Sequence, residues 1–326
     1  MKIKLRIMLP VAFLCVSFAL SAGVDRQTFV YSIRGADTLR LDRYVDTCAL
    51  VAESARPCLL FVFGGSFMRG RRDSPEYGDF FTYFARRGYA VVAIDYRLGL
   101  KDVAREIDVK QGGLKLFNAF TARFDGAVAM AVEDLFDATR FVVEHADEWH
   151  VDRGRITACG SSAGAITVLQ GEYERCADTP RAAALPGGFR YAGVISFAGC
   201  IFSSGKMEWK TRPAPILLFH GEADRNVPCD RIRFMRFGLY GSGRIAGQLE
   251  KMGAPYCLHT VENAEHEIAT VPMHRYLAEI EMFLDRFVHG GEQLSVRTVE
   301  GIAGRPAQKK KIGLKDCLKA NFNYSH

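Results

Sequence analysis

The amino-acid sequence predicts an α/β fold with a mostly parallel central sheet and helices on both of its faces. Short apolar runs that end at Gly or Asp alternate with segments whose apolar residues recur every three or four positions. Several of these runs are apolar at every position, as expected for strands that are covered on both faces. The alternation of strands and helices predicts parallel strands joined by crossover helices. With 326 residues, of which 48% are hydrophobic and 25% charged, the chain has the composition of an ordinary globular protein and excludes a disordered or collagen-like one.

Residues 1–22 have the pattern of a secretory signal peptide. Three basic residues, Lys2, Lys4 and Arg6, precede an almost wholly apolar stretch that ends at Leu20, and small residues follow. The apolar stretch is shorter than the roughly 20 residues of a membrane-spanning helix, and no later stretch approaches that length. We therefore expect an exported protein, periplasmic or secreted, without a stable membrane span after signal cleavage. An uncleaved anchor is the alternative interpretation.

The predicted elements follow in chain order. Residues 28–33 and 38–44 alternate polar and apolar side chains, which predicts antiparallel strands at the edge of the sheet. The sequence predicts strands over 58–63, 89–94, 155–159, 191–197, 215–219 and 256–261. It predicts helices over 79–87, 127–146, 162–172, 245–252 and 272–288. We expect one catalytic domain over 23–289, with insertions near 99–124 and 179–190 that help to build a substrate site.

Charge is unevenly distributed along the chain, whose formal net charge is +6. From Arg297 onward there are seven basic and two acidic residues, so 290–326 is predicted to be a basic tail that is poorly ordered or lies on the surface. The body of the chain is near neutral, and nothing in it indicates a nucleic-acid partner.

Eight cysteines remain after the signal segment. Export permits disulfides, but the spacing specifies no pairing. Cys58, Cys159 and Cys257 lie in predicted buried strands, where cysteine usually acts as a small apolar side chain. None of the cysteines has the spacing of metal ligands, so no metal is predicted.

The segment from Gly160 to Gly164 reads G-x-S-x-G, with Ser162 at its centre. It directly follows a predicted strand and opens a predicted helix, which is the context in which this pattern presents a nucleophilic serine. Flanking glycines allow the sharp turn, and the helix N-terminus offers N–H groups to a developing oxyanion. In the alternative interpretation the glycines only permit close packing, and Ser162 caps the helix. Ser161 is a competing hydroxyl at the x position.

A serine nucleophile requires a base and an acid that orients the base. Among the eight histidines, His266 lies in the loop after the last predicted strand, where ligands gather at the carboxyl ends of parallel strands. Asp224 follows the preceding strand and is the candidate acid, with Glu222 and Asp230 as near alternatives. The other interpretations are an exposed loop histidine and a turn-forming aspartate.

Gly64 and Gly65 follow a predicted central strand, within Phe63-Gly64-Gly65-Ser66-Phe67. Such a loop can direct backbone N–H groups at a negative oxygen. The N–H groups of Gly65 or Ser66, together with that of Ala163 after the nucleophile, are the candidate oxyanion hole.

With these motifs in order, the chain resembles the α/β-hydrolases, and more narrowly their carboxylesterase and acyl-carbohydrate esterase branch. The resemblance covers roughly 58–288 and rests on Gly64-Gly65-Ser66-Phe67, Asp95-Tyr96-Arg97-Leu98, Asp152-Arg153-Gly154-Arg155-Ile156, Gly160 to Gly164, His220-Gly221 with Asp224, and His266. It implies Ser162 as nucleophile, Asp224 as acid and His266 as base, in the chain order of that fold, and it implies no cofactor. Many relatives have a His where this chain has Phe63, so the shape of the glycine loop is not carried over.

The leading functional hypothesis is hydrolysis of a carboxylic ester through an acyl-Ser162 intermediate. The expected partner is a small-molecule or carbohydrate ester, with acetyl or feruloyl esters suggested by the resemblance; the sequence predicts no oligomeric state. Aromatic residues near the insertions could line an acyl or sugar pocket or belong to the core: Phe117, Phe120, Phe124, Tyr191, Trp209, Phe234 and Tyr240. The alternatives are a peptidase or amidase of the same fold and a non-catalytic binding protein.

Overall fold

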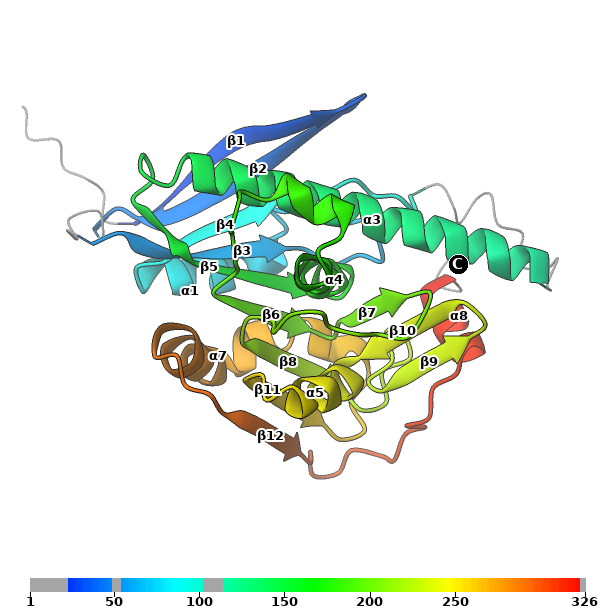
Figure 1. Cartoon of the computed structure of the whole chain (residues 1–326). Helices are drawn as coiled ribbons and strands as arrows, with labels where there is room; N and C mark the ends of the chain where they lie inside the picture. The colour runs from blue at the N-terminus through cyan, green and yellow to red at the C-terminus, as the bar shows by residue number, and fades with distance from the viewer. Residues whose placement is uncertain (1–22, 49–53, 102–113, 323–326) are drawn as a thin grey trace, which may run out of the picture.

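A computed structural model describes residues 23–48, 54–101 and 114–322. The predicted signal peptide lies outside these residues. Within them, a nine-stranded sheet has the order β1-β2-β4-β3-β5-β6-β8-β11-β12 (Figure 1). Its strands are β1 (Val24–Arg34), β2 (Asp37–Asp46), β3 (Arg56–Val62), β4 (Ala90–Ile94), β5 (Val151–Ser161), β6 (Gly193–Phe197), β8 (Ile216–Gly221), β11 (Tyr256–Val261) and β12 (Ser295–Glu300).

The direction of the strands matches the predicted architecture. β1 pairs with β2 and β2 with β4 in antiparallel register, whereas every pair from β4 to β12 is parallel. The strands β3, β4, β6, β8 and β11 contain almost only buried side chains, which explains their continuous apolar runs. The prediction of a mostly parallel sheet with antiparallel N-terminal strands is therefore confirmed.

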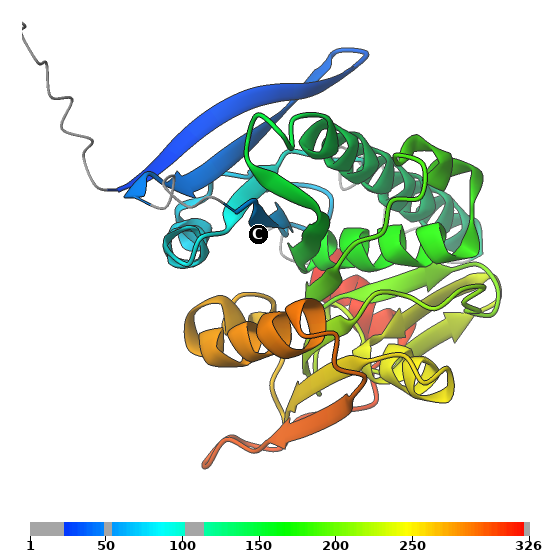
Figure 2. The ribbon, with the colours of Figure 1, turned by 60° about the vertical axis from the view of Figure 1, so that its left-hand side comes forward.

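Helices cover both faces of the sheet, as Figure 2 shows. One face carries α1 (Gly78–Arg86), α6 (Pro272–Arg275) and α7 (Leu277–Phe283), which continues as a wider turn over Leu284–His289. The other face carries α3 (Leu114–Glu144), α4 (Ala163–Ala177) and α5 (Ser242–Lys251). None of the helices in the described ranges is both long and apolar enough to cross a lipid bilayer.

A second sheet, not predicted from the sequence, lies beside the first and has the order β7-β10-β9. Its antiparallel strands are β7 (Cys200–Ser203), β10 (Phe237–Gly241) and β9 (Arg231–Phe234). The first three turns of α3 pack against it: Phe120 and Phe237 have ring centroids 6.0 Å apart, and Phe124 and Phe202 have ring centroids 5.6 Å apart. These turns belong to the stretch expected as an insertion at 99–124, of which 102–113 lie outside the described residues. The predicted helix over 127–146 therefore begins earlier, at Leu114.

The expectation for the basic tail is wrong for one of its two ordered segments. β12 does lie at the surface, with no fully buried side chain, but its backbone completes the sheet beside β11. Helix α8 (Leu314–Phe322) is not a surface appendage, because Cys317 is buried and several of its side chains face the interior. The predicted domain bounds, which end the catalytic domain at 289, stay a prediction.

Two motifs of the family resemblance have structural roles. The Arg97 guanidinium pairs with the buried Asp134 of α3 at 2.9 Å, and the backbone N–H of Arg97 donates to the same carboxylate at 2.7 Å. Arg155 pairs with Asp152 at 2.8 Å within β5. All eight cysteines in the described residues are free, and Cys58, Cys159 and Cys257 are buried in strands as expected.

Candidate active site

Ser162 occupies the sharp turn between β5 and α4. Its φ of 50° lies in the left-handed region, which a non-glycine residue adopts only where the surroundings impose it. The Ser162 N–H donates to the carbonyl of Phe197 at 2.9 Å. A Cβ at Gly160 would lie 2.3 Å from the Gly164 carbonyl oxygen, and one at Gly164 only 2.0 Å from that of Val62. Both glycines are therefore required for α4 to start so close to the sheet.

The competing hydroxyl has a different role. Ser161 is buried, and its Oγ–H donates to the carbonyl of Ala269 at 2.8 Å. This hydrogen bond ties the end of β5 to the short helical turn His266–Ala269. Ser161 therefore helps to place His266 and does not face the pocket beside Ser162.

The three residues of the predicted triad form one hydrogen-bonded chain. Ser162 Oγ lies 2.8 Å from His266 Nε2, and His266 Nδ1 lies 2.7 Å from Asp224 Oδ2. They meet because β5, β8 and β11 are parallel strands whose carboxyl ends share one edge of the sheet. Since a carboxylate accepts, Nδ1 carries the ring hydrogen, which leaves Nε2 free to accept from Ser162.

The Asp224 carboxylate is fully buried and firmly held. Its Oδ1 accepts from the N–H groups of Asn226 at 2.8 Å and Val227 at 3.0 Å, so only Oδ2 is available to His266. The two alternative acids lie elsewhere: Glu222 pairs with Lys310 at 2.6 Å, and Asp230 is exposed. The buried charge thus has three donors, as a desolvated carboxylate requires.

His220 stabilises the loop that holds Asp224, although it is not a member of the Ser162–His266–Asp224 triad. It is fully buried; its Nε2–H donates to the Val227 carbonyl at 3.1 Å, and its Nδ1 accepts from the Ser242 hydroxyl at 2.7 Å. Burial lowers the pKa of His220, which keeps the ring neutral. Its contact with the Val227 carbonyl stabilises the loop that presents N–H groups to Asp224.

Two tyrosines brace the glycine loop where many relatives have a histidine. Tyr96 stacks on Phe63 with ring centroids 4.5 Å apart, and its hydroxyl donates to the Phe63 carbonyl at 3.1 Å. The Gly64 N–H donates to the Tyr77 hydroxyl at 3.3 Å. Burial raises the pKa of Tyr96 well above its ordinary value, so its hydroxyl stays protonated and can donate. The loop is therefore held through its backbone on both sides of Gly64.

The candidate oxyanion donors lie in two places. Ser66 and Ala163 line the cavity beside Ser162, whereas Gly65 is outside the lining, in a turn where its carbonyl accepts from Met68 and Arg69. Among the described residues, no carbonyl accepts a hydrogen bond from the N–H of Ser66 or Ala163. These two N–H groups are the better placed donors for a negative oxygen near Ser162.

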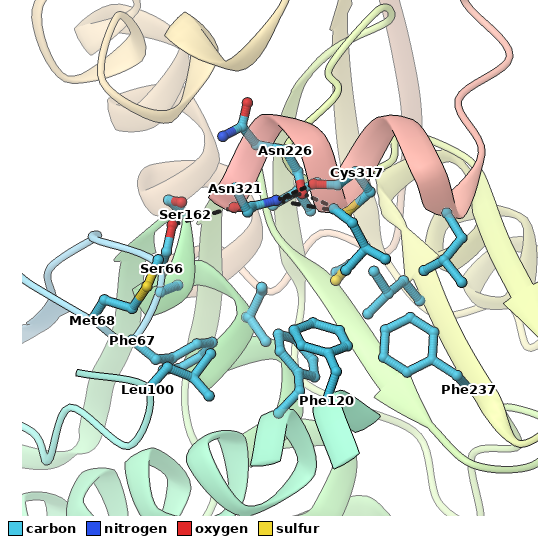
Figure 3. Close-up of a pocket in the computed structure, with 18 residues that line it drawn as sticks. Ser66, Phe67, Met68, Leu100, Phe120, Ser162, Asn226, Phe237, Cys317 and Asn321 are labelled. Carbon is cyan, nitrogen blue, oxygen red and sulfur yellow. Dashed lines mark hydrogen bonds between the residues drawn. The ribbon is translucent and has the colours of Figure 1, made fainter. Parts of the chain in front are cut away.

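The cavity itself is small and mostly apolar (Figure 3). Its volume is about 40 Å³, and its wall includes Phe67, Leu100, Ile166 and Leu239 beside Ser162. Of the seven aromatic residues singled out from the sequence, only Phe120 and Phe124 line it. The second predicted insertion, 179–190, contributes no lining residue. The other five aromatic residues make contacts elsewhere. For example, the Tyr191 hydroxyl forms a hydrogen bond with Thr139, and the Trp209 ring packs on Tyr173.

Sequence reasoning missed the C-terminal contribution to this cavity. Leu314, Cys317, Leu318 and Asn321 of α8 all line it (Figure 3). Their spacing of three and one residues is typical of one face of a helix. Lysines lie between them in a stretch with few apolar residues, so the pattern is weak in the sequence.

The segment between β12 and α8, which we call the strap (residues 301–313), crosses the loops that carry His266 and Asp224. Arg305 pairs with Glu267, the neighbour of His266, and the Gln308 N–H donates to Asn263 Oδ1 at 3.0 Å. Lys310 pairs with Glu222 in the loop of Asp224. The strap therefore fixes the path by which the chain returns from the edge of the sheet to the cavity.

Within the described residues, no group of three or more His, Cys, Asp or Glu side chains could hold a metal ion. What the arrangement can supply is an activated hydroxyl, a base held in one tautomer, two free N–H donors and an adjoining apolar cavity.

Comparison with solved structures relates the chain to esterase 2 of the planctomycete Thermogutta terrifontis. The form of that protein phosphorylated by paraoxon is 21% identical, with a TM-score of 0.55, covering 82% of this chain and 94% of that chain. The propionate-bound form is 22% identical, with a TM-score of 0.55 and coverage of 84% and 96%. No protein-family model and no curated protein sequence matches the chain. The architecture and these likenesses together show that the chain has the α/β-hydrolase fold found in serine esterases.

Proposed function

We propose that this protein is a serine hydrolase that cleaves carboxylic esters through an acyl-Ser162 intermediate. The observation that carries the proposal is the continuous chain from Ser162 Oγ through His266 to Asp224, at 2.8 Å and 2.7 Å, beside an apolar cavity. A serine hydroxyl held in this way loses its proton to the imidazole as it attacks a carbonyl carbon.

The reaction follows from the positions of these groups. As Ser162 Oγ forms a bond to the acyl carbon, its proton passes to His266 Nε2, and the carbonyl oxygen becomes negative near the N–H groups of Ser66 and Ala163. Asp224 stabilises the imidazolium through Nδ1–H. The Nε2 proton then goes to the leaving alcohol as its bond to carbon breaks. In the second half, His266 removes a proton from water, and the acid is released from Ser162.

The structural neighbours support this assignment. Thermogutta esterase 2 has been observed phosphorylated by paraoxon and phosphonylated by cyclosarin, and bound to propionate. Organophosphates react with activated serine hydroxyls, so the same reagents are suitable probes for Ser162. Acetyl or feruloyl esters of carbohydrates are the finer substrates that we propose for this chain.

The test compares Ser162→Ala with a matched control, Ser161→Ala, in the neighbouring hydroxyl that donates to Ala269. We expect the parent to hydrolyse p-nitrophenyl acetate and to be labelled by a fluorophosphonate. Ser161→Ala loses its hydrogen bond to the turn after His266 but keeps the Ser162 hydroxyl, so it should turn over more slowly and still be labelled. Ser162→Ala should lose the label and at least about 10⁴-fold in kcat. Equal turnover in Ser162→Ala and the parent, or no labelling of the folded parent, would overturn the proposal.

We also propose that the protein is exported, on the basis of the charged and apolar pattern of residues 1–22. Expression of the full chain, followed by cell fractionation and N-terminal sequencing, tests this. A cytoplasmic product that keeps its N-terminal residues would contradict export.

A further inference from the structure

Helix α8 forms one complete wall of the cavity beside Ser162. Leu314, Cys317, Leu318 and Asn321 line that cavity, at positions that a helix brings to one face. The lysine side chains at 315 and 319, on other faces of the helix, are exposed. In Figure 3 the helix lies across the cavity from Phe120 and Leu100.

The opposite wall is equally bulky, since it consists of Phe120 and Phe124 from α3 and Phe237 and Leu239 from the second sheet. Between the walls there remain about 40 Å³. For comparison, an apolar cavity that encloses one benzene molecule measures about 150 Å³. The cavity is therefore too small to enclose an aromatic acyl group such as feruloyl or a medium-length fatty acyl chain.

The position of the base decides which half of an ester enters the cavity. His266 must protonate the leaving alcohol, so the alcohol lies on the imidazole side of Ser162. His266 is not among the described residues that line the cavity, whereas Ser66 and Ala163, the candidate oxyanion donors, are. The cavity therefore receives the acyl chain. The His266 side chain is 24% exposed, so the alcohol side opens to solvent.

Hydrogen bonds fasten α8 to both loops of the site. Asn321 Nδ2 donates to the carbonyl of Asn226 at 2.9 Å, and Cys317 Sγ–H donates to the same oxygen at 3.1 Å. The Ser66 hydroxyl donates to Asn321 Oδ1 at 3.3 Å. Asn321 thus bridges the loop of Asp224 and the glycine loop (Figure 3). Widening the cavity by displacing α8 would break all three bonds.

Resting on the proposed ester hydrolysis, we infer that α8 restricts the enzyme to short aliphatic acyl groups, with the alcohol on the side of Ser162 where the His266 ring is partly exposed. Between the two finer substrates proposed above, this selects acetyl esters of carbohydrates over feruloyl esters. Leu318 and Leu314 determine the length limit, and Asn321 positions α8 against Ser66.

The test measures kcat/KM for p-nitrophenyl acetate, butyrate and octanoate. The parent should cleave acetate and butyrate and lose activity steeply on octanoate. Leu318→Ala should raise the octanoate-to-acetate ratio by roughly fourfold for each additional methylene group that the enlarged cavity buries. Leu318→Phe should change the ratio of butyrate to acetate in the opposite direction. Lys319→Ala, on the exposed face of the same helix, is the matched control and should leave every ratio unchanged.

The outcomes separate the two proposals. No hydrolysis of any ester and no fluorophosphonate label on the folded parent would refute both. Hydrolysis of acetate that depends on Ser162, together with equal activity on octanoate in the parent, would refute the length limit alone. Ratios unchanged in both Leu318 variants, with melting curves like the parent's, would likewise refute it. For the alcohol side, we expect acetylated xylo-oligosaccharides and acetylated xylose to be cleaved at similar kcat/KM. A loss of more than tenfold on the oligosaccharide would refute the placement of the alcohol on the side open to solvent.

Discussion

Replacing Asp224 with Asn tests the proposed mechanism at one atom. In the native protein, Oδ1 of this side chain accepts two backbone N–H groups, from Asn226 and Val227, and Oδ2 accepts from His266 Nδ1. An Asn at this position keeps its carbonyl oxygen against the two N–H groups, because its NH₂ would meet them donor to donor. The NH₂ therefore faces His266 Nδ1, which must then be the acceptor. The ring hydrogen moves to Nε2, and Nε2 can no longer accept the proton of Ser162.

The expected loss is large because the wrong tautomer removes the general base and not merely its orientation. The corresponding change in a serine-protease triad lowers kcat by about 10⁴-fold, which is about 5.4 kcal/mol of transition-state stabilisation. The side chain keeps three hydrogen bonds, so the free energy of unfolding should fall by only about 1–2 kcal/mol.

The assay is kcat for p-nitrophenyl acetate, with urea unfolding of the same samples. Asp230→Asn is the matched control, since Asp230 is exposed and close in sequence to Asp224. It should retain the activity of the parent. An Asp224→Asn protein that is folded and within tenfold of the parent would refute the assignment of Asp224 as the residue that sets the tautomer of His266.

Tyr96→Phe removes the hydroxyl that donates to the Phe63 carbonyl but keeps the ring. In urea titrations the free energy of unfolding should fall by about 1–3 kcal/mol, and kcat should change more than KM. A stability equal to the parent's would contradict the role of Tyr96 in holding the glycine loop. Gly164→Ala should fail to yield soluble folded protein, because its Cβ would lie 2.0 Å from the Val62 oxygen, whereas Gly247→Ala in α5 has nothing within 4 Å and should be tolerated; equal yields and melting temperatures for the two variants would refute the close approach. Burial lowers the pKa of His220 from its ordinary value of 6.5, so below pH 6.5 the unfolded chain binds a proton that the folded protein does not. The free energy of unfolding should therefore decrease with falling pH by up to about 1.4 kcal/mol per pH unit. In urea titrations between pH 5 and 8, His220→Gln should show a weaker dependence of the unfolding free energy on pH than the parent, and equal dependence would contradict this. A chain that starts at residue 23 has eight free thiols, of which only the exposed Cys48 should react rapidly with Ellman's reagent before unfolding. Burial raises the pKa of Cys58, Cys229 and Cys257 to about 12, which slows their reaction. Rapid reaction of several thiols in the native protein would contradict the burial of these cysteines.

The parts of the fold that could be predicted are those whose burial is indicated by a short stretch of sequence alone. A strand covered on both faces has to be apolar throughout, so β3, β4 and β6 are recognisable without knowledge of their neighbours. The same holds for the candidate triad, because Ser162, Asp224 and His266 each follow such a strand, and the parallel order places them at one edge. The turn at Ser162 is recognisable for a second local reason, since only glycine fits at 160 and 164.

The second sheet and β12 could not be predicted because β7 and β12 pair with strands that are distant in sequence, and because β9 and β12 lack an apolar run. In β9 only Ile232 is buried, and the arginines on either side of it are exposed, so the strand has no apolar run. No side chain of β12 is fully buried, and it is a strand because it pairs with the edge of β11. Pairing of this kind depends on which backbone groups remain unbonded elsewhere in the fold.

The brace on the glycine loop and the wall of the cavity were missed for a related reason. Tyr96 follows β4, the strand next to β3, so its contact with Phe63 appears only when the strand order is known. Helix α8 lies more than 150 residues after Ser162, and its lysines conceal an apolar face that has meaning only against Phe237 and Leu239. The glycine loop is therefore supported although this chain has Phe63 where many relatives have a histidine.

The strap has a consequence for how the protein could be altered by proteolysis. Residues 301–313 contain no helix or strand, and they are the only covalent link between β12 and α8. Hydrolysis of one peptide bond there would let α8 dissociate, while all nine strands of the main sheet stay in one uninterrupted polypeptide. A protease could thus remove the limit on acyl length and leave a molecule that keeps its triad and still melts cooperatively.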